Sequence, residues 1–135
     1  MRDDRKPLLQ AAREGLPIVR FELRSAKESS LRSTALDPVW MTAADDDMET
    51  VKVRSACIAR AAEQGWLRLS YALPVTRQRD YALYARSTLY ASFCNMVREG
   101  AGRPGFLFDT PFLKRGEARL TAAGRRILEE ENGQE

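Results

Sequence analysis

The sequence predicts a small α+β protein, a single domain with helices and two β-hairpins. Segments 48–64 and 87–99 carry apolar side chains at three- and four-residue spacing, which is typical of amphipathic helices. Segments 17–23 and 66–73 alternate apolar with polar residues, as half-buried strands do. At 135 residues and 44% hydrophobic composition, the chain can bury a core without disulfides or metal. We therefore expect one domain over residues 1–135.

The N-terminal region, residues 1–46, is expected to contain a helix, a strand and a loop. Residues 7–14 predict a short helix that begins with Pro7 and ends before Gly15. Its apolar residues either cover the core or form a homodimer surface. The strand at 17–23 follows, because its apolar and charged side chains alternate from Val19 to Leu23.

A polar segment separates this strand from the next helix. Residues 25–35 are rich in serine and lack periodicity, so they predict a loop, and Asp37-Pro38 predicts a turn or a helix start. Trp40 and Met41 are expected to anchor the following segment in the core.

Three consecutive carboxylates, Asp45 to Asp47, suggest either a metal site or a helix cap. No Gly and Glu follow at the spacing of a calcium loop. The run directly precedes the helix at 48–64, where acidic side chains accept bonds from free N–H groups and oppose the helix dipole. We expect capping, and the sequence predicts neither a metal nor a cofactor.

The predicted helix at 48–64 is followed by the first hairpin. One helix face groups Met48, Val51, Ser55, Ile58, Ala59 and Ala62, and Gly65 ends the helix. The strand at 66–73 is expected to pair with residues 81–84 across a long loop that presents Arg77 and Arg79 to solvent.

The second hairpin is predicted after the helix at 87–99, which Ser87 can cap and Gly100 can end. Short strands at 106–108 and 112–114, a turn at Arg115-Gly116 and a strand at 118–120 lead to Thr121, a cap for the last helix. Helix and hairpin thus occur twice in the same order. This is either a diverged repeat or ordinary α+β alternation.

Positive charge is concentrated in residues 51–128, which carry 14 basic and 5 acidic side chains. Residues 1–50 carry 8 basic and 10 acidic side chains, and the acidic tail 129–135 carries 4 carboxylates and no basic residue. The middle region is therefore suited to a polyanion, although 18 of the 22 basic residues are arginine and such residues also cover ordinary surfaces.

The remaining composition indicates a cytoplasmic protein that does not associate with membranes. Cys57 and Cys94 each lie in a helical pattern with no second cysteine or histidine nearby, so we expect buried, unpaired thiols. The N-terminus lacks the apolar segment of a signal peptide, and no run approaches the ~20 apolar residues of a membrane span.

Enzymatic activity is not expected. The chain contains no histidine, which excludes histidine-based triads, Cys-His pairs and histidine general bases. Residues 100–105 contain three glycines but lack the Lys-Ser/Thr ending of a phosphate-binding loop. Carboxylates such as Glu22, Asp37 and Asp109 have no spacing diagnostic of a metal-dependent nuclease.

The C-terminal third, with its helix, basic hairpin and Leu120-Thr121-Ala-Ala-Gly124 helix start, resembles winged-helix DNA-binding regulators. The resemblance implies a winged-helix-like fold in which the helix at 87–98 enters the major groove and the wing touches the adjacent backbone. The sequence departs from the pattern at 67–84, where a hairpin is predicted in place of the compact helical unit that normally precedes the wing.

We therefore expect a small nucleic-acid-binding protein, most simply a transcriptional regulator that binds double-stranded DNA. Cations would contact phosphates, while polar groups on the helix read base edges. The expected DNA-binding residues are Arg77, Arg79, Thr88, Ser92, Asn95, Arg98, Lys114, Arg115 and Arg119. The alternative is a protein-binding adaptor or inhibitor that uses its basic surface or a hairpin edge.

Overall fold

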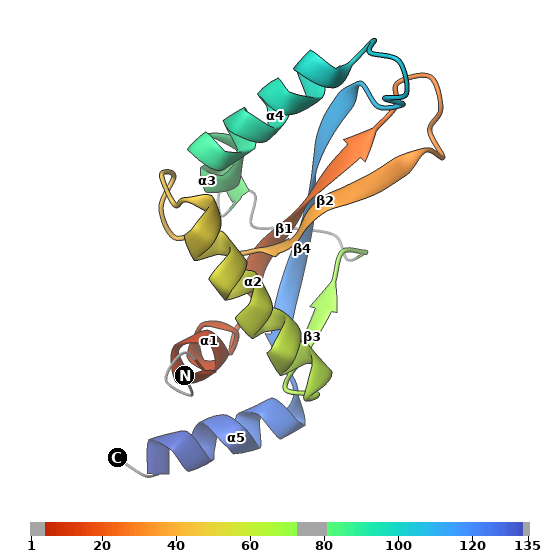
Figure 1. Ribbon diagram of the computed structural model, residues 1–135. Helices are drawn as coiled ribbons and strands as arrows, with labels where there is room; N and C mark the ends of the chain where they lie inside the picture. The colour runs from red at the N-terminus through yellow and green to blue at the C-terminus, as the bar shows by residue number, and fades with distance from the viewer. Residues whose placement is uncertain (1–4, 73–80, 134–135) are drawn as a thin grey trace.

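A four-stranded antiparallel sheet runs through the molecule, with helices along one side of it and at its lower end (Figure 1). The structure, a computed structural model, describes residues 5–72 and 81–133. Within these ranges the elements are α1 (Arg5–Ala11), β1 (Leu16–Arg24), β2 (Arg32–Val39), α2 (Met48–Glu63), β3 (Leu67–Ser70), α3 (Ala82–Ala85), α4 (Thr88–Gly100), β4 (Thr110–Leu120) and α5 (Ala122–Gly133). The predicted α+β class is confirmed.

The strands lie in the order β2-β1-β4-β3, so the two longest strands occupy the centre of the sheet. β1 and β4 pair in unbroken register from Leu16 opposite Ala118 to Arg24 opposite Thr110. The pairing of β1 with β2 is interrupted by two register shifts, between Val19 and Glu22. Because neighbours in register share a face, this pairing decides which side chains of distant segments meet.

Two hydrophobic clusters lie at opposite ends and opposite faces of the twisted sheet. Successive strand residues point to opposite faces, and accordingly the fully buried side chains of Ile18 and Val19 belong to different clusters. Ile18 packs with residues of α1, α2 and α5. Val19 and Phe21 pack with α3 and α4, where the Phe21 ring stacks 5.3 Å from that of Phe93. Burial of each such side chain contributes about 2 kcal/mol.

Most helices form where the sequence predicts them, and side chains cap them as expected. Asp47 accepts a bond from the Thr50 N–H at 2.8 Å, and Ser87 accepts one from the Tyr90 N–H at 3.1 Å. The Thr121 hydroxyl accepts the Gly124 N–H at 3.0 Å at the start of α5. α1 begins slightly earlier than predicted, and its leucines are buried in the core, as is Ala12, which follows the helix.

The loop predicted at residues 25–35 is correct for residues 25–31, but its last four residues and the turn predicted at Asp37-Pro38 are wrong. Residues from Arg32 onward form β2, and Pro38 lies within that strand after a cis peptide bond. β2 is an edge strand whose first four residues are exposed. It therefore lacks the apolar alternation by which a strand is recognised in a sequence.

The hairpin predicted between 66–73 and 81–84 does not form. β3 pairs with β4, with Leu67 opposite Leu120, and the segment after Tyr81 forms the short helix α3. Tyr81 and Tyr84 are three residues apart, a spacing that suits one face of a helix, and both rings are buried against α4 and the sheet.

The second predicted hairpin, the wing, is also absent, because β4 runs without a turn from Thr110 to Leu120. Gly116, expected at the turn, lies in mid-strand opposite Ile18. β4 pairs with β1 from Thr110 to Ala118, and the hydrogen bonds of this pairing outweigh the local turn tendency of Arg115-Gly116. The twofold helix–hairpin order suggested by the sequence is therefore not a structural repeat.

Two finer expectations also change. The buried residues of α2 are Val51, Ile58 and Ala61, whereas Met48 is exposed at the start of the helix. Cys57 and Cys94 are unpaired, as expected, but both are partly exposed where full burial was predicted.

Candidate functional site

Four of the predicted DNA-binding residues form an exposed stripe on α4. Thr88, Ser92, Asn95 and Arg98 all face solvent, because Phe93 and Val97 on the opposite side are buried in the core. The Arg98 guanidinium donates a hydrogen bond of 2.6 Å to the Asn95 amide oxygen. Both groups therefore already have a partner within the helix.

The predicted wing residues do not come together. Lys114 and Arg115 are successive residues of β4 and point to opposite faces of the sheet. The Arg115 guanidinium lies 5.9 Å from the centre of the Tyr81 ring, and Arg119 pairs with Glu117 at 2.7 Å. Arg77 and Arg79 lie outside the described residues.

Lys114 instead belongs to a cluster that the sequence pattern did not predict. At the end of the sheet where α4 covers one face, the opposite face carries charged and aromatic side chains from three strands. We call this surface the basic sheet face; its residues are Arg20, Glu22, Arg24, Arg32, Thr34, Phe112 and Lys114, with Asp37 and Tyr71 at one edge.

Glu22 lies at the centre of the basic sheet face and is only 4% exposed. Arg24 donates to its Oε1 from Nε at 2.9 Å and from Nη2 at 2.7 Å, and Arg20 donates to Oε2 at 3.4 Å. Burial raises the pKa of Glu22, but the hydrogen bonds and charges of the two arginines outweigh it, so the pKa lies below its ordinary value. The carboxylate therefore fixes both guanidinium groups in place.

Each of these arginines also lies over an aromatic ring. The Arg24 guanidinium carbon is 3.6 Å from the centre of the Phe112 ring, and that of Arg20 is 4.0 Å from the centre of the Tyr71 ring. Such cation–π contacts stabilise by about 0.5–2 kcal/mol each. The side chains of Arg20 and Arg24 remain 28% and 23% exposed, so solvent still reaches them.

Asp37 and Tyr71 complete one edge of the surface. The Tyr71 hydroxyl donates a hydrogen bond to the Asp37 carboxylate, and Arg20 Nε lies 3.4 Å from Asp37 Oδ2. Burial, reinforced by the bond and the charge of Asp37, raises the pKa of Tyr71 above its ordinary value. The phenol consequently stays protonated and keeps Asp37 beside Arg20.

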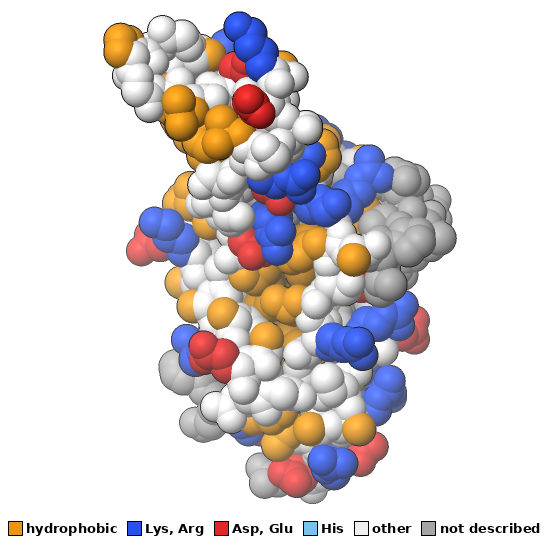
Figure 2. All heavy atoms as spheres, turned by 90° about the vertical axis from the view of Figure 1, so that its right-hand side faces the viewer, with side chains coloured by type: hydrophobic (Ala, Val, Ile, Leu, Met, Phe, Trp, Pro, Cys, Tyr) orange, Lys and Arg blue, Asp and Glu red, His pale blue; other side chains and the backbone are white. Residues whose placement is uncertain are grey.

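The basic sheet face carries four cations and two carboxylates. Lys114 and Arg32 have no carboxylate partner among the described residues, whereas Arg20 and Arg24 share Glu22. Figure 2, viewed from the right-hand side of Figure 1, shows several Lys and Arg side chains gathered next to hydrophobic side chains in the middle of that surface. The surface therefore presents two guanidinium planes that Glu22 holds in place, beside two cations that no described carboxylate neutralises.

The sequence contains one pattern that indicates this surface, but the pattern covers only three residues. Arg20, Glu22 and Arg24 recur at two-residue spacing, which places them on one strand face. Their partners come from residues 32, 71 and 112, and only the sheet pairing brings those segments together.

Other types of site find no support in the described part of the chain. Residues 5–72 and 81–133 contain no group of three His, Cys, Asp or Glu side chains arranged to hold a metal ion. None of the helices within these ranges combines the length and apolarity needed to cross a membrane. Comparisons with known proteins found no matching protein family, curated protein or solved structure.

Proposed function

We propose that the protein binds single-stranded nucleic acid through the basic sheet face. The observation that carries the proposal is the pair of arginines, Arg20 and Arg24, each stacked on an aromatic ring and held by Glu22. Single strands expose base faces, and proteins bind them by stacking on aromatic or guanidinium planes beside a basic surface.

Each part of the surface has a role in this proposal. The partly exposed guanidinium planes of Arg20 and Arg24 stack with unpaired bases, and Phe112 supplies a neighbouring apolar contact. Lys114 and Arg32, which have no carboxylate partner among the described residues, contact phosphates. Because their positions are pre-set by Glu22 and Asp37, Arg20 and Arg24 lose little conformational freedom on binding.

The charge balance predicts a moderate dependence on salt. Two cations free to neutralise phosphates give a slope of log affinity against log salt of about −1.4, at about 0.7 per contact for a single strand. Base stacking contributes about 1–3 kcal/mol per base without such salt dependence.

Titration of a labelled oligothymidylate over a range of salt concentrations tests the proposal. Lys114→Ala and Arg32→Ala are each expected to weaken binding and to reduce the slope by about 0.7. Lys52→Ala removes an exposed cation from α2 and is the matched control, with unchanged binding expected. Absence of binding at low salt, or equal losses in the control, would refute the proposal.

A second candidate is duplex recognition by α4, as the winged-helix resemblance implies for a transcriptional regulator. The exposed stripe of Thr88, Ser92, Asn95 and Arg98 favours it, since polar side chains on a helix can read base edges. The missing wing removes the second contact of that mechanism. Asn95→Ala should weaken binding of duplex, not of a single strand, if α4 is the interface.

The same titrations address the adaptor alternative. Wild-type protein that binds neither single strands nor duplex at low salt would favour a role in protein binding. The exposed edge strand β2 would then be the first surface to test, because its outer backbone groups can pair with another strand.

A further inference from the structure

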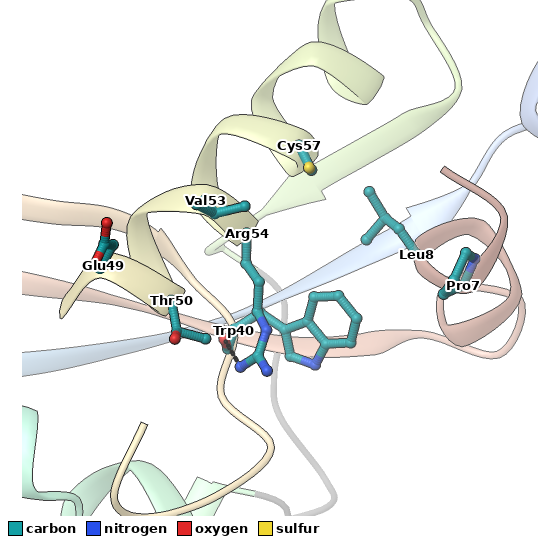
Figure 3. A pocket seen from close by; sticks show the side chains of 8 residues that line it. All are labelled: Pro7, Leu8, Trp40, Glu49, Thr50, Val53, Arg54 and Cys57. Atoms are coloured by element: carbon teal, nitrogen blue, oxygen red, sulfur yellow. Dashed lines mark hydrogen bonds between the residues drawn. The ribbon is translucent and has the colours of Figure 1, made fainter. Parts of the chain in front are cut away.

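A groove between α1 and α2 is lined by none of the residues of the basic sheet face or of the exposed stripe on α4. Its volume is about 540 Å³, and it is lined by Pro7, Leu8, Trp40, Glu49, Thr50, Val53, Arg54 and Cys57. Figure 3 shows Pro7 and Leu8 of α1 at one end, Glu49 and Thr50 at the other, and Trp40 between them. The volume lies within the usual range for small-molecule sites.

Most of the lining is apolar. The Trp40 ring, Val53 and Cys57 of α2 and Leu8 of α1 border the groove, and Val53 is 55% exposed although it is β-branched and hydrophobic. The residues from Glu49 to Cys57 span about 12 Å of α2, at 1.5 Å per residue. An elongated apolar body therefore fits along the helix beside the indole ring.

Two charged residues line the groove, and only one of them is free of an ion-pair partner within the described part of the chain. Arg54 donates a hydrogen bond to the Trp40 carbonyl oxygen at 3.2 Å (Figure 3). It also donates one to Asp46 Oδ2 at 2.7 Å, so its charge is compensated. Glu49, in the first turn of α2, is exposed and has no ion-pair partner among the described residues. Glu49 thus leaves its end of the groove with an uncompensated negative charge.

We propose that this groove binds small organic cations that have an elongated apolar body, such as arylalkylamines. The apolar part lies over Trp40 between Leu8 and Val53, and the ammonium group lies near Glu49. The charge complementarity of Glu49 determines the cationic class, while Trp40 and Val53 provide the apolar contact. A ligand of this size in an open groove is expected to bind with a dissociation constant of about 1 mM to about 10 μM.

Isothermal titration calorimetry with three matched probes tests the chemical class. 4-Phenylbutylamine, 4-phenylbutanol and 4-phenylbutyrate share one apolar body and differ only in end group. The amine is expected to bind the full-length protein at least about fivefold more tightly than the alcohol, and the carboxylate more weakly than both. Equal affinities for amine and alcohol, or no saturable binding of the amine, would overturn the proposal.

Substitutions test whether Glu49 is the residue that recognises the ammonium group. Glu49→Gln is expected to abolish the preference for amine over alcohol while leaving the alcohol affinity unchanged. Glu63→Gln, at an exposed glutamate near the other end of α2, is the matched control and should keep the preference. A preference that survives Glu49→Gln would show that another site binds the amine.

Cys57 provides an independent readout of position. In a Cys94→Ser background, saturating 4-phenylbutylamine should slow alkylation of Cys57 severalfold, because the thiol lines the groove. Val53→Trp fills the groove from an exposed position, and in that variant both the heat of binding and the protection should disappear. Unchanged alkylation while the amine binds would place the site elsewhere.

Discussion

The aromatic ring of Tyr71 lies over the α-carbon of Gly116, in the space that a side chain at residue 116 would fill. A Cβ atom on Gly116 would be 2.4 Å from Tyr71 Cδ1 and 2.7 Å from the carbonyl oxygen of Ser70. The same ring lies beneath the Arg20 guanidinium. A glycine in the middle of β4 thus allows Tyr71 to pack against the sheet and support one edge of the basic sheet face.

Gly116→Ala is expected to destabilise the protein by about 1–3 kcal/mol, because the added methyl group meets both a ring and a backbone oxygen. Chemical denaturation measures the loss. Gly133→Ala is the control, since a Cβ atom there meets nothing within 4 Å, and its effect should stay within about 0.5 kcal/mol. Equal stability of the two variants would mean that Tyr71 does not pack on Gly116.

Glu22→Gln is expected to lower stability at neutral pH by about 1–3 kcal/mol, because the buried carboxylate accepts bonds from two arginines. The folded protein holds the pKa of Glu22 below the ordinary value of 4.5. Its stabilising contribution is therefore fully present above about pH 4.5 and is lost as pH falls through the lowered pKa.

Denaturation curves between about pH 7 and about pH 3 check the sign of this effect. Wild-type protein should lose stability more steeply in the acid part of the range than Glu22→Gln, and the two should converge there. Other carboxylates with lowered pKa values, such as Asp46, remain in both proteins and cancel in the comparison. Parallel pH profiles would contradict the role assigned to Glu22.

Tyr84→Phe should cost about 1–3 kcal/mol without changing the shape of the core. The Tyr84 hydroxyl donates to the Pro17 carbonyl oxygen at 2.8 Å and accepts the Met41 N–H at 3.3 Å, which ties α3 to β1 and to the segment after β2. Removing it deprives the buried Met41 N–H and the half-buried Pro17 carbonyl oxygen of this partner. Thermal unfolding with a crystal structure of the variant would test this, and an unchanged melting temperature would argue against the two bonds.

Ser87→Ala is expected to destabilise α4 by about 1–2 kcal/mol. The buried Ser87 hydroxyl donates to the Tyr84 carbonyl oxygen at 2.7 Å and accepts the Tyr90 N–H at 3.1 Å. Hydrogen exchange of the first-turn amides of α4 provides the measurement, with Thr121→Ala at the start of α5 as a comparison. Faster exchange confined to α4 in Ser87→Ala is the expected pattern.

The sequence by itself determined three of the helices and where they begin. α2, α4 and α5 carry apolar residues at helical spacing and follow Asp47, Ser87 and Thr121, so the information lies within each segment. The long strand β1 was predicted from the alternation of its apolar and charged side chains, which also lies within the segment. These features depend on contacts between residues that are near one another in the chain.

The tertiary structure alone decided the pairing of strands and the location of the candidate site. β4 reads locally as a hairpin, because Arg115-Gly116 favours a turn, yet pairing with β1 keeps it extended. β2 carries no periodic signal because it lies exposed at the sheet edge. Since the face that a strand residue occupies depends on its register with distant strands, Lys114 joins Arg20 and Arg24, and Arg115 does not.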